Sequence, residues 1–223
     1  MPDLFDGLGE TPTSKGARCG ELERWAHAQG FARVIGLDEA GRGPLAGPVV
    51  AAAVALPYPC LVEGINDSKI LNETRREALF RPIQEHALAW AIASCSPTEI
   101  DEHNILRASL MAMARAFQQL SLDRETIQSA LVVTDGNKRA PLPPGVDQRP
   151  LVKGDQRSLN IAAASILAKV TRDRLMQQFD EQWPQYGFAQ HKGYPTAAHQ
   201  EALLNHGPCP IHRRSFNLSG RRR

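Results

Sequence analysis

Two apolar segments joined by a glycine-rich turn constrain the fold of this chain more than any other feature. Residues 33–38 read as a strand that ends in an acidic pair, and residues 49–56 read as a second strand rich in valine and alanine. The turn between them, residues 40–47, is short enough to join two antiparallel strands. The sequence therefore predicts a β-hairpin with acids at the end of its first strand.

The rest of the chain alternates between helical and extended patterns. We predict helices at residues 21–29, 72–87, 104–120, 158–182 and 196–206, and a helix start at Ser96 and Pro97. Further strands are predicted at residues 90–94, 130–134 and 151–153, with a proline-rich loop at 141–150 before the last of them. This order of strands and helices predicts an α/β sheet protein.

Composition is typical of an ordinary globular protein. Hydrophobic residues make up 42% and charged residues 22% of the 223 residues, which suits one domain of good size. We expect residues 1–30 to be a flexible extension with one short helix, residues 31–216 to be the main domain, and residues 217–223 to be a basic tail. The formal net charge is only +2, so nucleic-acid binding would need a local cluster of basic residues.

Targeting signals and cysteine usage both predict a cytoplasmic protein. The N-terminal segment lacks the apolar core of a signal peptide, and the longest apolar run, residues 44–59, is too short and too interrupted to span a membrane. None of the four cysteines forms a CxxC pair, so reduced thiols are expected. His206, Cys209 and His212 have the spacing of metal ligands, but no second pair completes a zinc site.

Four acidic residues stand at or just after the ends of predicted strands. Asp38 and Glu39 close the first strand, Asp135 closes the fourth, and Asp155 follows the fifth. Strand ends in α/β sheets open into a crevice where ligands bind. Crowded carboxylates repel one another, so they stay ionised only if a cation neutralises them, and hard oxygen ligands favour Mg²⁺ or Mn²⁺ over zinc. We therefore expect a divalent-metal site at this edge of the sheet.

Such a site suits phosphodiester hydrolysis. Two ions about 4 Å apart can lower the pKa of an attacking water and stabilise the leaving oxygen. Asp38, expected at the centre of the sheet, is the candidate to bridge the two ions. Taken singly, each acid could equally be a solvated turn residue or a helix cap. The four acids together favour the catalytic interpretation.

The glycine-rich turn, residues 41–47, contains GxGxxxG and so resembles a dinucleotide-binding loop, which would predict an oxidoreductase. That loop requires a helix straight after the glycines and an acid about 20 residues downstream. Here a strand pattern follows, and the acids come before. We interpret Gly41 and Gly43 instead as places where a ligand sugar can approach the main chain, with Arg42 adding charge. A row of backbone groups can sense a 2′-hydroxyl, which both donates and accepts hydrogen bonds.

A polar stripe on the predicted helix 158–182 suits a phosphate backbone. Ser165, Lys169 and Arg172 fall at positions i, i+4 and i+7 and share one face. Residues 153–174 hold five basic and two acidic residues, a local charge of +3. Such groups fix register on a nucleic acid without reading its sequence, although a solvated helix face would look the same. The segments 191–194 and 212–214 add cations and Tyr194, which can stack on a base or sugar.

These residues, taken in order, resemble the ribonuclease HII family. The resemblance rests on six blocks that follow one another in the family's order: residues 38–49 (DEAGRGPLAGPV), 66–69 (NDSK), 135–137 (DGN), 153–155 (KGD), 163–173 (AASILAKVTRD) and 186–196 (YGFAQHKGYPT). The match covers about residues 34–216. About 30 residues precede it, too few for the extra N-terminal domain of the related ribonuclease HIII, so type HII is expected.

The resemblance implies a fold, an activity and its requirements. The fold is an α/β ribonuclease H-like fold with a central mixed five-stranded sheet, flanking helices and a helical C-terminal part. The activity is endonucleolytic cleavage of the RNA strand in RNA–DNA hybrids, and cleavage 5′ to a single ribonucleotide in duplex DNA, leaving 5′-phosphate and 3′-hydroxyl ends. Two divalent cations, Mn²⁺ or Mg²⁺, are implied as cofactors. We expect a monomer that binds RNA–DNA hybrids and ribonucleotide-containing duplex DNA.

The resemblance also assigns roles to individual residues. The catalytic and metal-binding acids are Asp38, Glu39, Asp135 and Asp155. The 2′-hydroxyl contacts fall to Gly41, Arg42 and Gly43, stacking on the deoxyribose after the junction to Tyr194, and phosphate contacts to Lys69, Ser165 and Lys169. Two other readings stay open: a hybrid-binding protein that has lost catalysis, and the nucleotide-cofactor enzyme. The intact set of four acids argues against the former.

Overall fold

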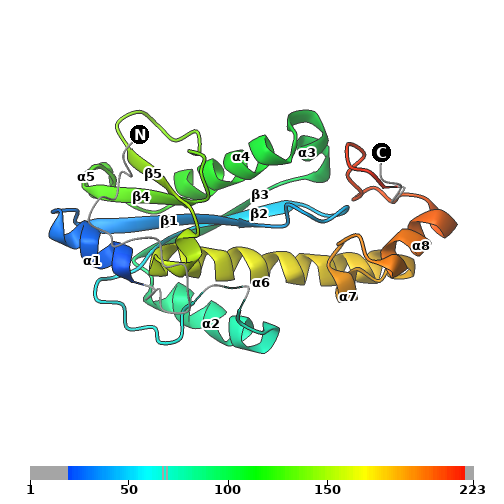
Figure 1. Cartoon of the computed structure of the whole chain (residues 1–223), viewed down its shortest axis with the longest axis horizontal. Coiled ribbons are helices and arrows are strands. Elements are labelled where there is room, and N and C mark those ends of the chain that lie inside the picture. The colour runs from blue at the N-terminus through cyan, green and yellow to red at the C-terminus, as the bar shows by residue number, and fades with distance from the viewer. Residues whose placement is uncertain (1–19, 67, 69, 219–223) are drawn as a thin grey trace.

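Five strands form one mixed sheet in the computed structural model, which describes residues 20–66, 68 and 70–218 (Figure 1). The strands are β1 Arg33–Ala40, β2 Val49–Ala55, β3 Ala89–Cys95, β4 Ala130–Asp135 and β5 Asp147–Leu151. Their order across the sheet is β3-β2-β1-β4-β5. The β1/β2 and β2/β3 pairs are antiparallel, and the β1/β4 and β4/β5 pairs are parallel. The predicted α/β class with a mixed five-stranded sheet is confirmed, and β1 lies at its centre.

The predicted hairpin is formed by β1 and β2, which pair from Gly36–Val54 to Ala40–Val50. β1 runs two residues further than predicted, so Asp38 and Glu39 belong to the strand itself. Because β2 follows the glycine-rich turn as a strand, the turn lacks the helix that a dinucleotide-binding loop requires.

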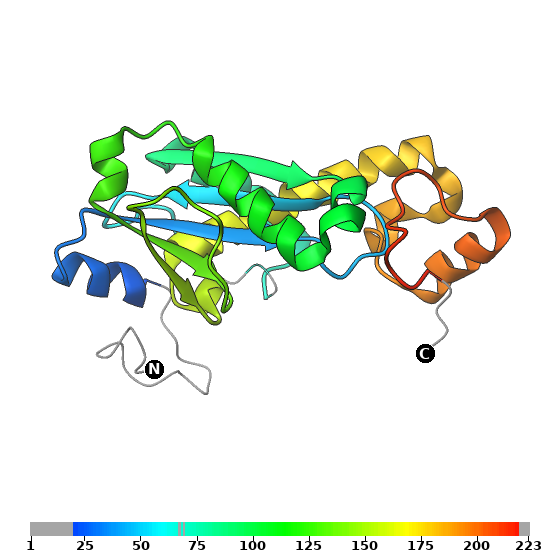
Figure 2. The same cartoon turned by 90° about the horizontal axis from the view of Figure 1, so that it is seen from above.

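Helices cover both faces of the sheet (Figure 2). They are α1 Glu21–Ala28, α2 Glu73–His86, α3 Pro97–His103, α4 Ile105–Gln118, α5 Arg124–Gln128, α6 Leu159–Gln182, α7 Phe188–His191 and α8 Ala197–His206. Val49 and Ala51 of β2 pack with α3 and α4, whereas Val50 and Ala52 pack with α2 and α6. A strand covered on both faces has no polar side, which explains why β2 reads as an unbroken apolar run.

The predicted helix starts are confirmed by their caps. The side chains of Asn72, Ser96, Ser158 and Thr196 each accept a hydrogen bond from a backbone N–H in the first turn of the helix that follows. Ser96 forms a full capping box, with Pro97 at the first helical position. α5, α7 and two 3₁₀ turns, Gly154–Gln156 and Pro184–Tyr186, were not predicted.

The last strand lies earlier in the chain than predicted. The prediction placed it at residues 151–153, after a proline-rich loop, whereas β5 runs from Asp147 to Leu151 and includes Pro150. β5 is an edge strand, where a residue without an N–H can be accommodated. The chain then enters the 3₁₀ turn that carries Asp155.

α6 lies directly against the central strand. A Cβ on Gly36 of β1 would come within 2.2 Å of the carbonyl carbon of Asn160, so only glycine permits this approach. The carboxylate of Glu23 on α1 accepts hydrogen bonds from the Ser158 hydroxyl at 2.6 Å and from the Asn160 amide side chain at 2.9 Å. The short helix expected within residues 1–30 is therefore present and packed onto α6. Residues 1–19, expected to be flexible, and the Arg221–Arg223 part of the tail lie outside the described residues.

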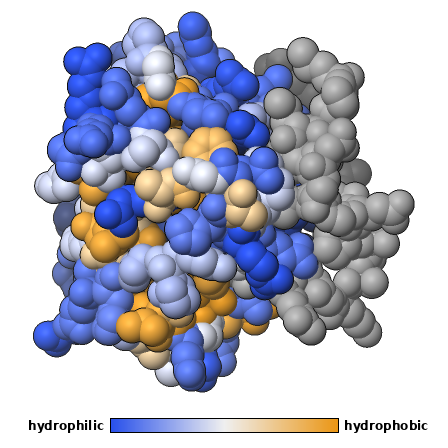
Figure 3. Space-filling model, turned by 90° about the vertical axis from the view of Figure 1, so that its left-hand side faces the viewer, coloured by the Kyte–Doolittle hydropathy of each residue, from blue (hydrophilic) through white to orange (hydrophobic). Residues whose placement is uncertain are grey.

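The expected helical C-terminal part is present beyond one end of the sheet, where α7, α8 and residues 207–218 pack against the glycine-rich turn (Figure 1). The opposite end, where β1 begins, shows a mostly hydrophilic surface with separate hydrophobic areas (Figure 3). Within the described residues, no helix has both the length and the apolar character to cross a bilayer. Cys60, Cys95 and Cys209 are free thiols. The predicted domain limits, 31–216 and 217–223, stay predictions.

Candidate active site

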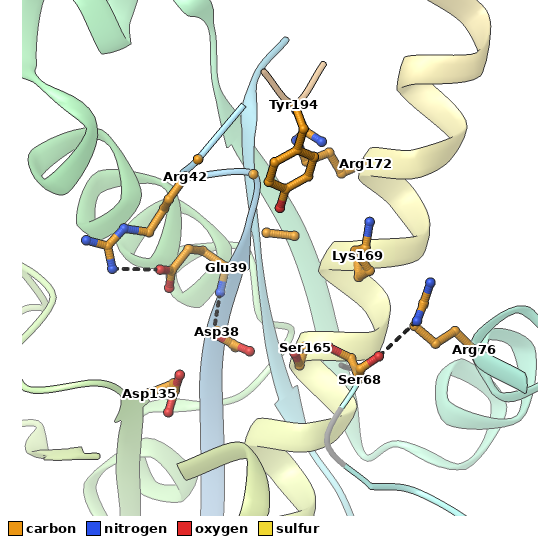
Figure 4. Close-up of a pocket in the computed structure, with 13 residues that line it drawn as sticks. Asp38, Glu39, Arg42, Ser68, Arg76, Asp135, Ser165, Lys169, Arg172 and Tyr194 are labelled. Carbon is orange, nitrogen blue, oxygen red and sulfur yellow. Dashed lines mark hydrogen bonds and ion pairs between the residues drawn. The ribbon is translucent and has the colours of Figure 1, made fainter. Parts of the chain in front are cut away.

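A cavity of about 470 Å³ opens beside the end of β1 (Figure 4). It is lined by Asp38, Glu39, Ala40, Gly41, Arg42, Gly43, Ser68, Arg76, Asp135, Ser165, Lys169, Arg172 and Tyr194. The structure thus brings together all the predicted site residues except two. Lys69 lies outside the described residues, and Asp155 does not line the cavity.

Strand pairing brings two of the acids together. β1 and β4 are parallel neighbours in which Leu37 pairs with Thr134, so Asp38 and Asp135 follow at the same edge of the sheet. Figure 4 shows both carboxylates beside the cavity, with Glu39 above them. The predicted crevice at strand ends therefore exists, built from residues almost 100 positions apart in sequence.

Asp38 is buried in an unfavourable electrostatic environment. Asp38 is 4% exposed. Burial raises the pKa of its carboxyl group well above the usual range, and the charges of Glu39 and Asp135 add to the effect. The Ser165 hydroxyl and the Glu39 N–H, which donates to Asp38 Oδ1 at 2.7 Å, act in the opposite direction. A carboxylate in this position is stabilised most effectively by a bound cation.

Glu39 is held by the arginine of the glycine-rich turn. Arg42 Nη1 lies 3.2 Å from Glu39 Oε1, and the Arg42 side chain is about half exposed. Burial raises the pKa of Glu39, whereas Arg42 lowers it. Arg42 thus links the acids to the turn.

Asp155, the fourth predicted acid, does not line the cavity that the other three acids share. It is buried in the 3₁₀ turn after β5. Its neighbour Gly154 donates its N–H to Asp135 Oδ1 at 2.8 Å, which fixes the Asp135 carboxylate. Within the described part of the chain, no three Asp, Glu, His or Cys side chains form a ready-made metal site. The donor chemistry nevertheless fits a hard cation, because three acids with oxygen donors share the cavity, and among the described residues Arg42 is the only cation that forms a salt bridge with one of them.

The opposite wall of the cavity carries hydroxyl and basic groups from α6 and α2. Ser165 Oγ lies 2.8 Å from Ser68 Oγ, and Lys169 Nζ lies 2.6 Å from Asp173 Oδ1. Burial lowers the pKa of Lys169. Ser165 and Lys169 thus face the cavity as predicted, but each already has a partner.

Sequence reasoning missed two lining residues, Ser68 and Arg76. Arg76 on α2 donates from Nη1 to the Ser68 carbonyl at 2.9 Å, so that it supports the segment before α2. The sequence gives little reason to single out Arg76 as a site residue, because it lies in a helix with many other charged residues.

The interpretation of Arg172 as a phosphate ligand is wrong. The side chain is 1% exposed and donates to the carbonyls of Ala46, Pro48 and Lys192 at 3.0–3.1 Å. Burial lowers its pKa to about 10. His212 and Arg213, read as further surface cations, are buried as well. The helical period correctly places Arg172 on the same face of α6 as Ser165 and Lys169. The glycine-rich turn and the end of α7 cover this face at Arg172.

The glycine-rich turn needs glycine for steric reasons. Gly41 has φ +100°, and a Cβ there would lie 2.0 Å from Arg172 Nε. A Cβ on Gly43 would lie 3.3 Å from Cε1 of Tyr194, whose residue is 44% exposed at the mouth of the cavity. The turn and Tyr194 are therefore two walls of one opening.

The segment with the metal-like spacing, which we did not interpret as a zinc site, forms a contact between two histidines. Cys209 Sγ lies 3.1 Å from His212 Nδ1, but His212 Nε2 lies 3.0 Å from His199 Nε2. His206 contacts the Tyr186 ring, whose centroid also lies 5.0 Å from that of His212. The three residues do not converge on one point.

Comparisons with known proteins agree with this geometry. A model of the ribonuclease HII family matches residues 35–219. Ribonuclease HII of Vibrio vulnificus (strain YJ016) is 51% identical over 196 residues, which cover 88% of this chain and 91% of that protein. Ribonuclease HII of Ruminiclostridium cellulolyticum is 53% identical over 195 residues, which cover 87% of this chain and 74% of that protein.

Solved structures give the same fold. The crystal structure of ribonuclease H2 from Pyrococcus horikoshii has a TM-score of 0.69 and 27% identity, covering 84% of this chain and 95% of that chain. Bst-RNase HIII in complex with Mn²⁺ has a TM-score of 0.70 and 18% identity over 95% of this chain and 74% of that chain, a likeness of fold alone. The ribonuclease H-like fold is thus confirmed.

The fold and these relatives define a hydrolase of the ribonuclease H class, an endoribonuclease that cleaves RNA paired with DNA. Within that class, the chain belongs to the ribonuclease HII family.

Proposed function

We propose that this chain cleaves on the 5′ side of single ribonucleotides embedded in duplex DNA, as well as within longer RNA–DNA hybrids, and leaves 5′-phosphate and 3′-hydroxyl ends. The observation that carries the proposal is the buried Asp38 carboxylate, which shares a cavity with Glu39 and Asp135 at the foot of the glycine-rich turn. Removal of ribonucleotides from DNA as a repair step would follow from this activity.

The acids are proposed to hold two divalent cations, Mg²⁺ or Mn²⁺. Asp38 is the candidate bridging ligand, Glu39 and Asp135 lie on either side of it, and Asp155 is the fourth acid from the neighbouring 3₁₀ turn. When bound, such ions supply an attacking water of lowered pKa and stabilise charge on the leaving oxygen. The complex of Bst-RNase HIII with Mn²⁺ is compatible with this assignment.

The protein groups around the acids orient the substrate. Lys169 and Ser165 are proposed to contact phosphates on one side of the scissile bond, with Lys69 as a third phosphate ligand. Lys169 would exchange part of its pairing with Asp173 for a phosphate oxygen. Such contacts set the register of the nucleic acid without reading its bases.

Recognition of the ribonucleotide is proposed to occur at the opening between the turn and Tyr194. Gly41, Arg42 and Gly43 would contact the 2′-hydroxyl, and the Tyr194 ring would stack against the deoxyribose that follows it. Two successive nucleotides, a ribonucleotide followed by a deoxyribonucleotide, would contact both the turn and Tyr194. We also keep a monomeric state and a cytoplasmic location as predictions.

One experiment tests the proposal. A 3′-labelled duplex with a single ribonucleotide is incubated with the protein and with Mg²⁺, Mn²⁺ or EDTA, and the cut is mapped against a ladder. A cut 5′ to the ribonucleotide with either cation and none with EDTA is the expected result. Binding without cleavage under all conditions would instead favour the hybrid-binding alternative, and neither binding nor cleavage would contradict both.

A further inference from the structure

The C-terminal segment, residues 207–218, supports the glycine-rich turn from behind. Gly47 N donates to the Ile211 carbonyl at 2.9 Å, and Arg213 N donates to the Leu45 carbonyl at 2.9 Å. His212 and Arg213 stand next to each other in this segment, and both side chains are buried. The Arg213 side chain contacts the turn directly, and the His212 side chain is connected to Tyr194 through His199.

Arg213 holds the turn. Its guanidinium is 0% exposed and donates to carbonyl oxygens along the whole turn: Gly41 at 2.6 Å, Pro44 at 2.7 Å, Gly47 at 2.9 Å, Arg42 at 3.1 Å and Pro48 at 3.3 Å. A guanidinium has five N–H donors in a fixed plane, a geometry that lysine cannot reproduce.

The carbonyls that point to Arg213 leave the other side of the turn available. The N–H groups of Arg42 and Gly43, two residues that line the cavity, have no acceptor among the described residues. A backbone held by its carbonyls, with N–H groups unpaired, is prepared to meet a hydroxyl oxygen without rearrangement.

His212 acts on the other wall through His199. His199 Nδ1 lies 2.9 Å from the Tyr194 carbonyl, which can only accept, so Nδ1 carries the proton and Nε2 accepts. His212 Nε2, 3.0 Å away, must then donate, while His212 Nδ1 accepts the Cys209 N–H at 2.9 Å. The three hydrogen bonds form one directional chain with both rings neutral, and it ends at the backbone of Tyr194.

The Tyr194 wall has a further support in His191. The Gly193 N–H donates to His191 Nδ1 at 3.1 Å, and the His191 ring stacks on His199 with centroids 4.5 Å apart. Leu45 N donates to the Gly193 carbonyl at 2.8 Å, which ties the Tyr194 wall to the turn. The relative position of the two walls therefore depends on groups that do not line the cavity.

We propose that His212, acting through His199, and Arg213 are positioning residues that set the spacing between the glycine-rich turn and Tyr194, and thereby the selectivity for a ribose–deoxyribose junction. The inference rests on the proposed function, because it assumes that these two walls contact the junction. A long RNA–DNA hybrid that offers no deoxyribose after the cut depends less on the spacing.

The test compares two substrates across matched variants. The variants are Arg213→Lys, which keeps the charge but loses the planar set of donors, His212→Ala, and His212→Gln, whose amide can still donate to His199 Nε2. Arg115→Lys serves as the control, because Arg115 also donates to a backbone carbonyl, that of Ser94, on the far side of the sheet. kcat/KM is measured on a duplex with one ribonucleotide and on a long hybrid, and folding is checked by thermal unfolding.

Arg213→Lys and His212→Ala should lower kcat/KM on the single-ribonucleotide duplex about tenfold more than on the hybrid, since small misplacements of contact groups have large effects on rate. His212→Gln should keep most of the selectivity, and Arg115→Lys should leave it unchanged. Equal losses on both substrates, equal effects of His212→Gln and His212→Ala, or loss of folding in all three variants would overturn the proposal. Failure of the unmodified protein to cut the single-ribonucleotide duplex would contradict the proposed function itself.

Discussion

Asp38 and Asp135 stand beside each other because β1 and β4 are parallel neighbours in which Leu37 pairs with Thr134. The pairing places one carboxylate on the central strand and the other at the end of the adjacent strand. Burial raises the free energy of the ionised form of Asp38, and the nearby charges of Glu39 and Asp135 add to this cost. The sheet therefore holds the two acids together although they repel, an arrangement that a bound cation would stabilise.

The Asp38→Asn variant tests this arrangement. The amide has nearly the same shape but lacks the charge, so we expect cleavage to fall by at least about a hundredfold, as for the loss of one group that stabilises a transition state. Hybrid binding, measured by fluorescence anisotropy in EDTA, should be unchanged or tighter, because one negative charge near the phosphates is removed. Glu85→Gln, on the exposed face of α2, is the matched control and should keep full activity. Cleavage by Asp38→Asn at the normal rate would contradict the proposed metal site.

The Tyr194→Ala variant tests the proposed stacking wall. Base or sugar stacking on an aromatic ring contributes roughly 1–3 kcal/mol, so cleavage of the single-ribonucleotide duplex should fall about tenfold or more. Cleavage of a long hybrid and the Mn²⁺ concentration needed for half-maximal activity should change little. Tyr58→Ala, an exposed tyrosine at the other end of the sheet, is the control. Equal losses on the two substrates would rule out a specific role of Tyr194 at the junction.

The sequence predicted the parts of the fold that depend on local pattern. The hairpin of β1 and β2, the helix starts at Ser96 and Ser158, and the acids at strand ends all follow from periodicity, caps and turn residues. β5 was misplaced because Pro150 reads as a loop residue, and only its position at the sheet edge makes it compatible with a strand.

The roles of the buried cations could not be predicted in the same way. Arg172 and Arg213 look like surface cations in sequence, because most arginines are exposed. Most of their acceptors are carbonyl oxygens of residues 41–48, more than 120 residues earlier in the chain, and Arg172 also donates to the Lys192 carbonyl. Periodicity tells which face of a helix a residue occupies, but not which distant segment covers that face. Asp155 illustrates the same limit, because a 3₁₀ turn rather than a strand end determines where it lies.

Substitution of Gly41 by alanine should destabilise the protein as well as the site. Gly41 has φ +100°, and an added Cβ would lie 2.0 Å from Arg172 Nε, which is fixed by backbone carbonyls. Backbone strain and the displacement of a buried guanidinium should together cost at least about 2 kcal/mol in free energy of unfolding, measured by urea titration. Gly145→Ala has a similar positive φ of +89° with nothing within 4 Å of the new Cβ, and should cost only about 1 kcal/mol. Equal losses in the two variants would mean that the contact with Arg172 is unimportant.

Acid should destabilise the C-terminal part through His212. Burial, and the charge of His199, lower the pKa of His212 to about 4, below its ordinary value near 6.5, and burial lowers the pKa of His199 as well. The unfolded chain therefore binds more protons than the folded one between these values. The stabilising contribution is fully present above pH 6.5 and is lost as the pH falls towards 4, by up to about 3 kcal/mol.

Urea titrations at pH 7.5 and pH 5 measure this effect. The other titratable groups around the His212 ring are His199, His191, Cys209 and Tyr186. His212→Gln keeps an amide that can donate to His199 but cannot titrate, so the loss of stability between the two pH values should shrink. The exposed His86→Gln variant should leave it unchanged. If His212→Gln retains the full loss at pH 5, the acid sensitivity has another origin, and the neutral hydrogen-bond chain from His212 to Tyr194 does not contribute to it.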